Sequence, residues 1–331
     1  MYRRTLFSIA CLLCLLPPCV AQDVQARAQS MLQRARQLSD IRSSGAPAFR
    51  LTATFSFVGS DLETVHGTYT ETWISDSQWR RETVIGDRHY IDLAAPGKHW
   101  LVFPDAFPTQ ASKLPTLMSF LPPASLDLVF DSISERSNPY VTAECAFTKP
   151  TAQNAHFVLC FEKKSGVLLE KGFPEKRPRN LVNLNCEYGT FQKFGDYAFP
   201  REVDCLEDRH KSITANVVEL TLEPPNDPAL FDPPPGAIDL GHCAGKAVPP
   251  TLIGSGIVMP GLNLEEVAWL SVWFVLDEKG TPQNLRVLRS VDKHAHDNAW
   301  NAVRNWRFKP GTCDGKPMPM PLTVEIPFTP H

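Results

Sequence analysis

Histidine and carboxylate side chains gather near the C-terminus, where residues of these types could bind a metal ion. His294 and His296 stand beside Asp292 and Asp297, and imidazole and carboxylate groups are common ligands of zinc. A His-x-His pair in a loop before a helix is usually solvated, however, and the sequence offers no clear third ligand. We therefore predict no metal site at this position.

Two other charged groups could supply a general acid and a general base. They are Asp208-Arg209-His210 and the pair Asp61 and Glu63, which both fall at predicted turns and are more typical of solvated loops. The sequence has no Gly-x-Ser-x-Gly motif, no P-loop and no Gly-x-Gly-x-x-Gly before a helix. We predict no catalytic residue and no cofactor, and hence a binding protein rather than an enzyme. An exported hydrolase is the alternative, and it would require a clustered nucleophile and base.

The nine cysteines of the chain indicate disulfides rather than a metal centre. Three of them lie within residues 1–21. The other six are an even number in a chain that we expect to be exported, and they include no Cys-x-x-Cys pair of the kind that binds zinc. Six cysteines allow 15 pairings, between which the sequence alone does not choose. Local geometry favours Cys145 with Cys160, Cys186 with Cys205, and Cys243 with Cys313.

Residues 1–21 have the pattern of a secretory signal peptide. Arg3 and Arg4 precede an apolar run over residues 6–16, and residues 19–21 form a small-residue cleavage site. A helix that spans a membrane needs ~20 apolar residues, and the run over residues 6–16 is shorter than that. We therefore favour a cleaved leader, and a retained inner-membrane anchor is the alternative. We predict a periplasmic or secreted protein that associates with membranes only through its partners.

The charge of the chain argues against a nucleic acid partner. The formal net charge is −3, and loss of the two positive charges of Arg3 and Arg4 with the leader takes it to −5. A domain that binds phosphates would carry a clustered basic excess, and the sequence has none.

A helix followed by many strands is predicted after the leader. Apolar residues recur with helical spacing over residues 23–39. A second helical segment, interrupted by Pro122-Pro123, is predicted over residues 114–134. From Phe49 onward apolar and polar residues alternate, as in a strand with one buried face. Consecutive hairpins with few helices predict an α+β fold with an antiparallel, strongly curved, half-barrel-like sheet and helices on one face. Further strands are predicted over residues 64–74, 79–85, 89–93, 98–103, 141–147, 156–162, 167–171, 182–191 and 213–222.

An amphipathic helix followed by such a long meander resembles the LolA/LolB-like half-barrels of periplasmic lipoprotein carriers. In that family the concave face is an apolar pocket for acyl chains. The resemblance implies an alternative function for this chain, as a carrier of lipid or another hydrophobic ligand through its N-terminal β domain.

Prolines mark the end of this region and predict a linker. The predicted organisation is a signal peptide at residues 1–21, a β-rich domain at 22–232, a proline-rich linker at 233–250 and a second domain at 251–331.

The second domain has a β-β-α-β pattern. A strand over residues 268–277 leads through a turn at Asp277-x-x-Gly280 into a second strand with the sequence Val287-Leu288-x-Ser290. A helix over residues 297–306, with Asp297 as its N-cap, and an alternating strand over residues 318–328 follow.

The helix ends in the sequence Trp306-Arg307-Phe308-Lys309-Pro310. With this aromatic-basic-aromatic stop, the pattern over residues 245–331 resembles the C-terminal domain of the TonB family of periplasmic energy transducers.

The last strand of this domain has the features of a sheet edge. Pro317, Pro319 and Pro321 occupy one alternating set of positions, and proline cannot donate a ladder hydrogen bond. A sheet edge with unpaired amides can recruit an extended peptide, although these prolines could equally serve only to prevent aggregation.

In the TonB family, an extended segment of a receptor is captured at this strand. The resemblance therefore implies an outer-membrane receptor or another envelope protein as the partner, in a transport-related role. It places the contact on Met320, Leu322, Thr323, Val324 and Glu325.

Overall fold

The computed structural model describes residues 18–59, 63–122, 126–149, 157–176, 181–207, 210–222, 227–243, 245–254, 268–289 and 293–328. Within these ranges, none of the helices combines the length and the apolar character that a bilayer crossing requires.

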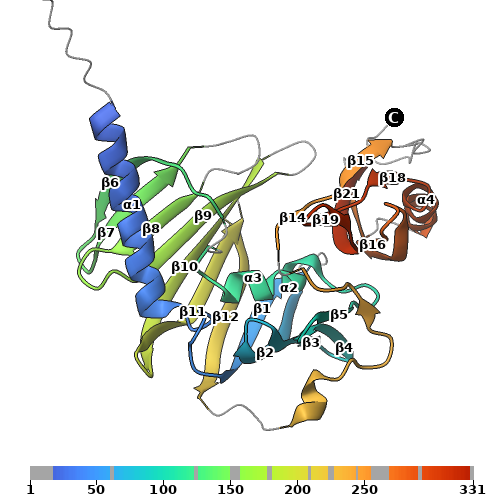
Figure 1. The fold of residues 1–331 in the computed structure, drawn as a ribbon, viewed down its shortest axis with the longest axis horizontal. Coiled ribbons are helices and arrows are strands. Elements are labelled where there is room, and N and C mark those ends of the chain that lie inside the picture. The colour runs from blue at the N-terminus through green and yellow to red at the C-terminus, as the bar shows by residue number, and fades with distance from the viewer. Residues whose placement is uncertain are drawn as a thin grey trace, which may run out of the picture.

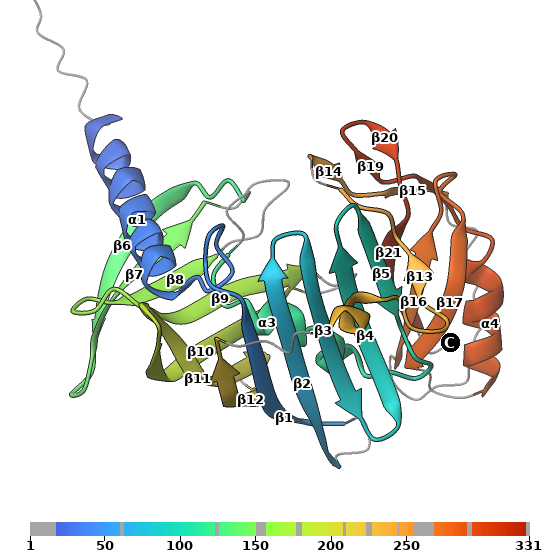
Figure 2. The same cartoon turned by 60° about the horizontal axis from the view of Figure 1, so that its bottom comes forward.

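One open antiparallel sheet of 13 strands forms most of the molecule (Figures 1 and 2). Its spatial order is β13-β5-β4-β3-β2-β1-β12-β11-β10-β9-β8-β7-β6, so its two edge strands do not pair and the sheet curves without closing. The predicted curved antiparallel sheet is therefore confirmed. Its strands are β1 (Phe49–Val58), β2 (Thr64–Ser75), β3 (Gln78–Ile85), β4 (Arg88–Ala95), β5 (Lys98–Val102), β6 (Phe130–Ser137), β7 (Thr142–Thr148), β8 (Val158–Glu162), β9 (Leu168–Lys176), β10 (Leu181–Phe194), β11 (Tyr197–Glu207), β12 (His210–Thr221) and β13 (Ile238–Asp239).

Three helices cover the apolar face of this sheet. They are α1 (Pro18–Ser39), α2 (Thr109–Ser112) and α3 (Leu114–Met118). Helix α1 buries Ala28, Leu32 and Ala35 in the same core as the alternating apolar residues of β1. Gln25 of α1 also donates to the carbonyl of Leu128 at 3.1 Å and accepts from the amide of Phe130 at 2.6 Å. The helix thereby occupies part of the edge that β6 would otherwise expose.

The helical segment that the sequence predicts over residues 114–134 is wrong in its second half. Helix α3 ends at Met118, and β6 begins at Phe130. Leu126, Leu128 and Phe130 have the period of a strand, and the last two are buried. Across the other face of the sheet, a short 3-10 helix, η1 (Pro228–Phe231), packs Phe231 against β4.

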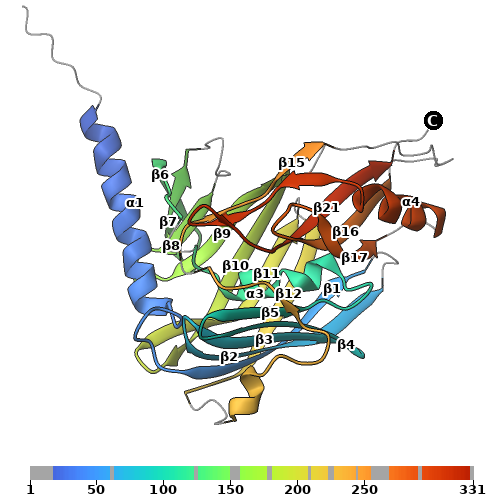
Figure 3. The same ribbon diagram turned by 45° about the vertical axis from the view of Figure 1, so that its right-hand side comes forward.

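The C-terminal unit comprises residues 247–254 and 268–328 (Figure 3). It holds a second hydrophobic core. Its central sheet has the order β17-β16-β21, and α4 packs one face of that sheet. The predicted β-β-α-β order is confirmed. Its elements are β14 (Ala247–Val248), β15 (Thr251–Gly254), β16 (Ala268–Leu276), β17 (Pro282–Arg289), α4 (Lys293–Val303), β18 (Arg307–Lys309), β19 (Thr312–Cys313), β20 (Lys316–Pro317) and β21 (Met320–Phe328).

Helix α4 begins at Lys293, earlier than predicted. Asp297 is therefore not an N-cap, and it lies inside the helix. The helix also ends earlier than predicted, at Val303 instead of Trp306. Arg307 donates to the carbonyls of Trp306 at 2.8 Å and of Arg304 at 3.4 Å, and so supports the chain just after the helix.

Three disulfides connect Cys145 with Cys160, Cys186 with Cys205, and Cys243 with Cys313. These are the pairs that local geometry favours in the sequence. The first two join residues that face each other on adjacent strands. The third joins the proline-rich segment to β19, while β13, from the same segment, pairs with β5 of the main sheet.

Candidate functional site: the outer edge of β21

The polar residues that could have formed a metal or catalytic site are only partly described. His296 and Asp297 lie exposed on α4, with 3.2 Å between His296 Nδ1 and Asp297 Oδ1. In the described ranges, no three His, Cys, Asp or Glu side chains converge as metal ligands do. That the chain binds no metal ion and is not an enzyme therefore stays a prediction. Outside the described part lie Asp61, Asp208, Arg209 and Asp292, together with the side chains of His210 and His294.

A buried charged cluster, which sequence reasoning missed, lies on the apolar face of the main sheet. The Glu71 carboxylate has no exposed surface; it accepts from Arg42 Nε at 2.9 Å, from Arg81 Nε at 3.1 Å and from the Tyr69 hydroxyl at 3.0 Å. Burial alone raises the pKa of Glu71, but the two guanidinium groups outweigh it and lower the pKa to about 2. Because Arg42 also donates to the carbonyl of Met118 at 3.3 Å, the cluster fastens α3 to the sheet, which is a structural role.

We predict that this cluster makes the fold sensitive to acid. The folded-state pKa of Glu71 lies below its ordinary value of 4.5, so the ionised carboxylate stabilises the fold above that value. The contribution disappears as the pH falls from 4.5 through about 2. Urea unfolding at a series of pH values should show this loss for the wild type. The Glu71→Gln variant should be less stable at neutral pH and depend less on pH in this window; parallel curves for the two proteins would contradict the assignment.

Strand β16 is covered on both of its faces, as the sequence predicts for a central strand. Leu270, Val272 and Phe274 face α4 and belong to the core of the C-terminal unit. Trp273 and Val275 face the other way and are buried in the core of the main sheet. The C-terminal unit is thus held against the main sheet through β16. A partner strand could therefore add only to one of the two edge strands of its sheet, β21 or β17.

Strand β21 is an edge strand with an uninterrupted register. Its nine residues pair one to one with β16, from Met320 opposite Leu276 to Phe328 opposite Ala268. Of the strands in the described part of the chain, none pairs with the other side of β21. A regular edge without a bulge is the surface to which an extended chain adds most readily.

Two prolines fix which backbone groups face this outer edge. Pro321 and Pro327 lie opposite Val275 and Trp269, on the same alternating set as Thr323 and Glu325. In an antiparallel pair, the backbone N–H and C=O of alternate residues point toward and away from the neighbouring strand. Because a proline has no amide hydrogen, this set must be the one that points away from β16. The outer edge therefore presents the amides of Thr323 and Glu325 and the carbonyls of all four residues.

The opposite edge of the sheet, β17, is far less suited to strand addition. Its pairing with β16 shifts register twice, and Asn284 adopts a left-handed conformation with φ 52°. Bulges of this kind twist an edge away from a flat ladder. Arg286 of β17 is also engaged elsewhere, because its Nε lies 2.8 Å from Asp105 Oδ1 of the main-sheet part.

The residues that the family resemblance proposes as partner contacts separate into two groups. Leu322 and Val324 pack against the core under α4, and Met320 lies half-buried beside Gly311. Thr323 is exposed and is the one whose backbone and side chain are both available. Of Glu325, the structure describes the backbone only. The sequence could have shown that Thr323 differs from its neighbours, because it shares the alternating set of Pro321.

The turn before β17 explains the motif Asp277-x-x-Gly280. The Asp277 carboxylate accepts from the amides of Lys279 and Thr281, each at 2.9 Å, which builds a tight side-chain-to-backbone turn. Gly280 has φ +75°, and its carbonyl accepts from the amide of Phe308 at 3.0 Å. The turn thereby holds the aromatic stop after α4 against the start of β17.

We predict that Gly280→Ala destabilises the C-terminal unit. A Cβ at this position would lie 1.9 Å from the carbonyl oxygen of Phe308, and a left-handed conformation costs roughly 1–2 kcal/mol for alanine even without that clash. Chemical unfolding should show a loss of at least about this size. Gly315→Ala is the matched control, because its φ is +80° but no atom lies within 4 Å of the added Cβ. An equal loss for both variants would show that the clash with Phe308 has no effect.

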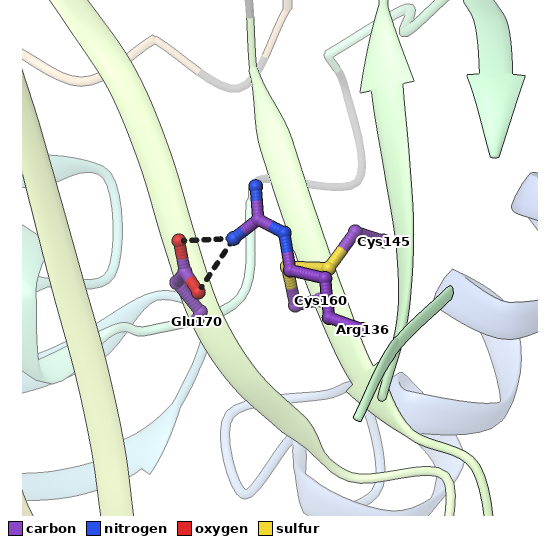
Figure 4. The surroundings of a disulfide bond; sticks show 4 residues. All are labelled: Arg136, Cys145, Cys160 and Glu170. Atoms are coloured by element: carbon purple, nitrogen blue, oxygen red, sulfur yellow. Dashed lines mark hydrogen bonds and ion pairs between the residues drawn. A yellow bond between two sulfur atoms is a disulfide. The ribbon is translucent and has the colours of Figure 1, made fainter. Parts of the chain in front are cut away.

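The described part of the chain has two clefts beside the main sheet. One, of about 440 Å³, is lined by the Cys145–Cys160 disulfide and by residues from β6 to β11. There the Arg136 guanidinium reaches past the disulfide to Glu170, at 3.4 Å (Figure 4). The other, of about 560 Å³, lies between α1 and residues 126–130. Neither is the apolar pocket that the carrier hypothesis requires, so that hypothesis stays a prediction.

Comparison with known proteins gives one family match and several structural likenesses. Residues 268–330 match the family of the Gram-negative bacterial TonB protein C-terminal domain. No curated protein matches the chain. Among solved structures, a domain described as an outer membrane lipoprotein-sorting protein from Vibrio parahaemolyticus has 13% identity and a TM-score of 0.43. That likeness covers 62% of this chain and 97% of the other.

Two further structures are similar over the same share of this chain. A LolA superfamily protein from Nitrosomonas europaea has 11% identity and a TM-score of 0.42, and a DUF1329 family protein from Desulfovibrio piger has 12% and 0.44. Both likenesses cover 62% of this chain, with 97% and 96% of the other chains. At these TM-scores they carry nothing about function. The region that contains β16, β17, α4 and β21 is thus the part of the chain that is similar to TonB C-terminal domains.

Proposed function

We propose that this chain is an exported protein of the bacterial envelope that binds the extended segment of an envelope partner, such as an outer-membrane receptor, by strand addition to β21. The observation that carries the proposal is the regular, unpaired outer edge of β21 in the described residues. The match of residues 268–330 to the TonB C-terminal family supports the same mode of binding. The export pattern of residues 1–21 supports the location.

The chemistry of this edge suits backbone recognition. An added strand accepts hydrogen bonds from the amides of Thr323 and Glu325 and donates to the carbonyls of the same set of residues. Side chains of the added strand extend either the half-buried row of Leu322 and Val324 or the exposed row of Thr323. The affinity then comes mainly from backbone hydrogen bonds, whereas the choice of partner depends on side-chain contacts with the row of Leu322 and Val324.

Hydrogen-exchange mass spectrometry of the mature chain tests this function. The probes are synthetic peptides that tile the periplasm-facing segments of the outer-membrane receptors of the host. At least one peptide should slow exchange in residues 320–328 and leave β17 unchanged, because the peptide covers only the outer edge of β21. If no peptide alters exchange in residues 320–328, the proposed function is wrong.

A further inference from the structure

Prolines enclose the outer edge of β21 at both ends. Pro321 and Pro327 flank Thr323 and Glu325 on the outward set. This edge is therefore rich in acceptors, with a carbonyl at every outward residue but an amide hydrogen only at Thr323 and Glu325. An added strand therefore binds best when it brings backbone amide hydrogens to the carbonyls of Pro321 and Pro327, at the two ends of this edge.

We propose that Pro321 and Pro327 select the occupant of this edge, so that it takes an extended segment of another protein and rejects a second copy of β21. The proposal rests on the proposed function, and it specifies the chemistry of the partner. The occupant has amide hydrogens at all alternate positions that face β21, and hence no proline there. It carries apolar side chains beside Leu322 and Val324.

Counting hydrogen bonds shows why the edge discriminates. An antiparallel segment without proline forms two bonds each with Thr323 and Glu325 and one with each proline carbonyl, about six in all. Two copies of β21 that face each other, with Thr323 opposite Glu325, place Pro321 opposite Pro327 at both ends. Those end pairs form no bond, so about four remain. The proline carbonyls also lose water without gaining a donor, which is costly when the contact is dry.

The test removes both prolines from the mature chain and measures its mass in solution. Sedimentation velocity should show a monomer for the wild type. Pro321→Ala/Pro327→Ala should roughly double the apparent mass as protein concentration rises, because each copy then offers four donors on the outer edge. Pro319→Ala is the matched control: it removes a proline that precedes β21, and the chain should stay monomeric. Adding both Thr323→Pro and Glu325→Pro to the double variant removes the inner donors of each copy, returns the count to about four bonds as in the wild type, and should restore the monomer.

Three results would overturn the proposal. They are a folded double variant that remains monomeric, a dimer that survives addition of both Thr323→Pro and Glu325→Pro, and a wild-type dimer protected from exchange at residues 320–328. Far-ultraviolet circular dichroism and thermal unfolding verify the fold. Should the double variant unfold, Pro321→Ala alone decides, because Pro321 is exposed and its replacement removes little packing. This single variant should dimerise more weakly than the double variant. A monomer at every concentration would reject the proposal.

The outcomes separate this proposal from the proposed function. A monomeric double variant whose β21 is still protected by a receptor peptide rejects selection by the prolines and keeps strand addition. A double variant that dimerises, in a protein whose wild type responds to no receptor peptide, supports selection by the prolines and rejects the receptor partner.

Discussion

Thr323→Pro is expected to weaken binding of the partner segment about tenfold without unfolding the protein. The substitution removes one of the two amide donors on the outer edge of β21 and leaves a carbonyl of the partner without its hydrogen bond. Loss of such a bond costs roughly 1–2 kcal/mol, and 1.4 kcal/mol corresponds to a tenfold change in affinity. The ladder between β21 and β16 survives, because the N atom of residue 323 points away from β16 in the register that the prolines define. Peptide titration followed by fluorescence anisotropy measures the effect.

Two further variants separate this effect from other causes. Thr323→Val keeps the amide hydrogen and the branched shape, so it should bind nearly as well as the wild type if the backbone carries the contact. Leu322→Pro places the same proline one residue earlier, on the set that pairs with Phe274, and should unfold the C-terminal unit. If Thr323→Val loses as much affinity as Thr323→Pro, the hydroxyl carries the contact, and the backbone mechanism is wrong.

The C-terminal unit could be predicted well because its signals are local. The Asp277-x-x-Gly280 turn, the two-sided apolar strand β16 and the aromatic stop at Trp306 each depend on neighbours within a few residues. The capping of α4 was harder to predict. Asp297 has the residue type of an N-cap, but the helix begins at Lys293, so a carboxylate in the right neighbourhood did not identify the first turn.

In the large sheet, the sequence analysis missed β6 and β11, because residues within or just before each of them favour another structure. The sequence around β11 contains Pro200, which argues against a central strand. The ladder between β11 and β12 begins only at Glu202, opposite Asn216, so Pro200 lies where β12 requires no donor. Similarly, β6 is preceded by an apolar run that can be taken for a helix, and only its pairing with β7 shows that it is a strand.

For the candidate site, local sequence patterns predict part of the structure, and the rest depends on contacts between residues far apart in the chain. The sequence identifies the last strand as an edge through its prolines, but not which side of it stays free. That follows from the pairing of Val275 with Pro321 and of Trp269 with Pro327, which joins residues far apart in the chain. The buried partners of Glu71 come from three separate segments, and no local pattern could have brought Arg42 to it.

The junction between the C-terminal unit and the main sheet depends on one aromatic side chain more than on the ion pair beside it. Trp273 is 3% exposed and stacks on Phe103, with 4.4 Å between the ring centroids. The Asp105 side chain that pairs with Arg286 is 87% exposed. Exposed ion pairs contribute about 0–1 kcal/mol, whereas truncation of a buried tryptophan costs about 3–5 kcal/mol.

Trp273→Ala should therefore loosen the whole C-terminal unit from the main sheet, whereas Arg286→Ala should change little. In chemical unfolding, Trp273→Ala should lose about 3–5 kcal/mol. Trp300→Ala provides the matched control, since Trp300 lies on α4 and is 37% exposed; its loss should stay below about 1 kcal/mol. Hydrogen exchange in Trp273→Ala should rise both in β16 and in residues 101–107, because the same contact protects both. If the rise is confined to the C-terminal unit, Trp273 stabilises only its own sheet and does not hold the two parts together.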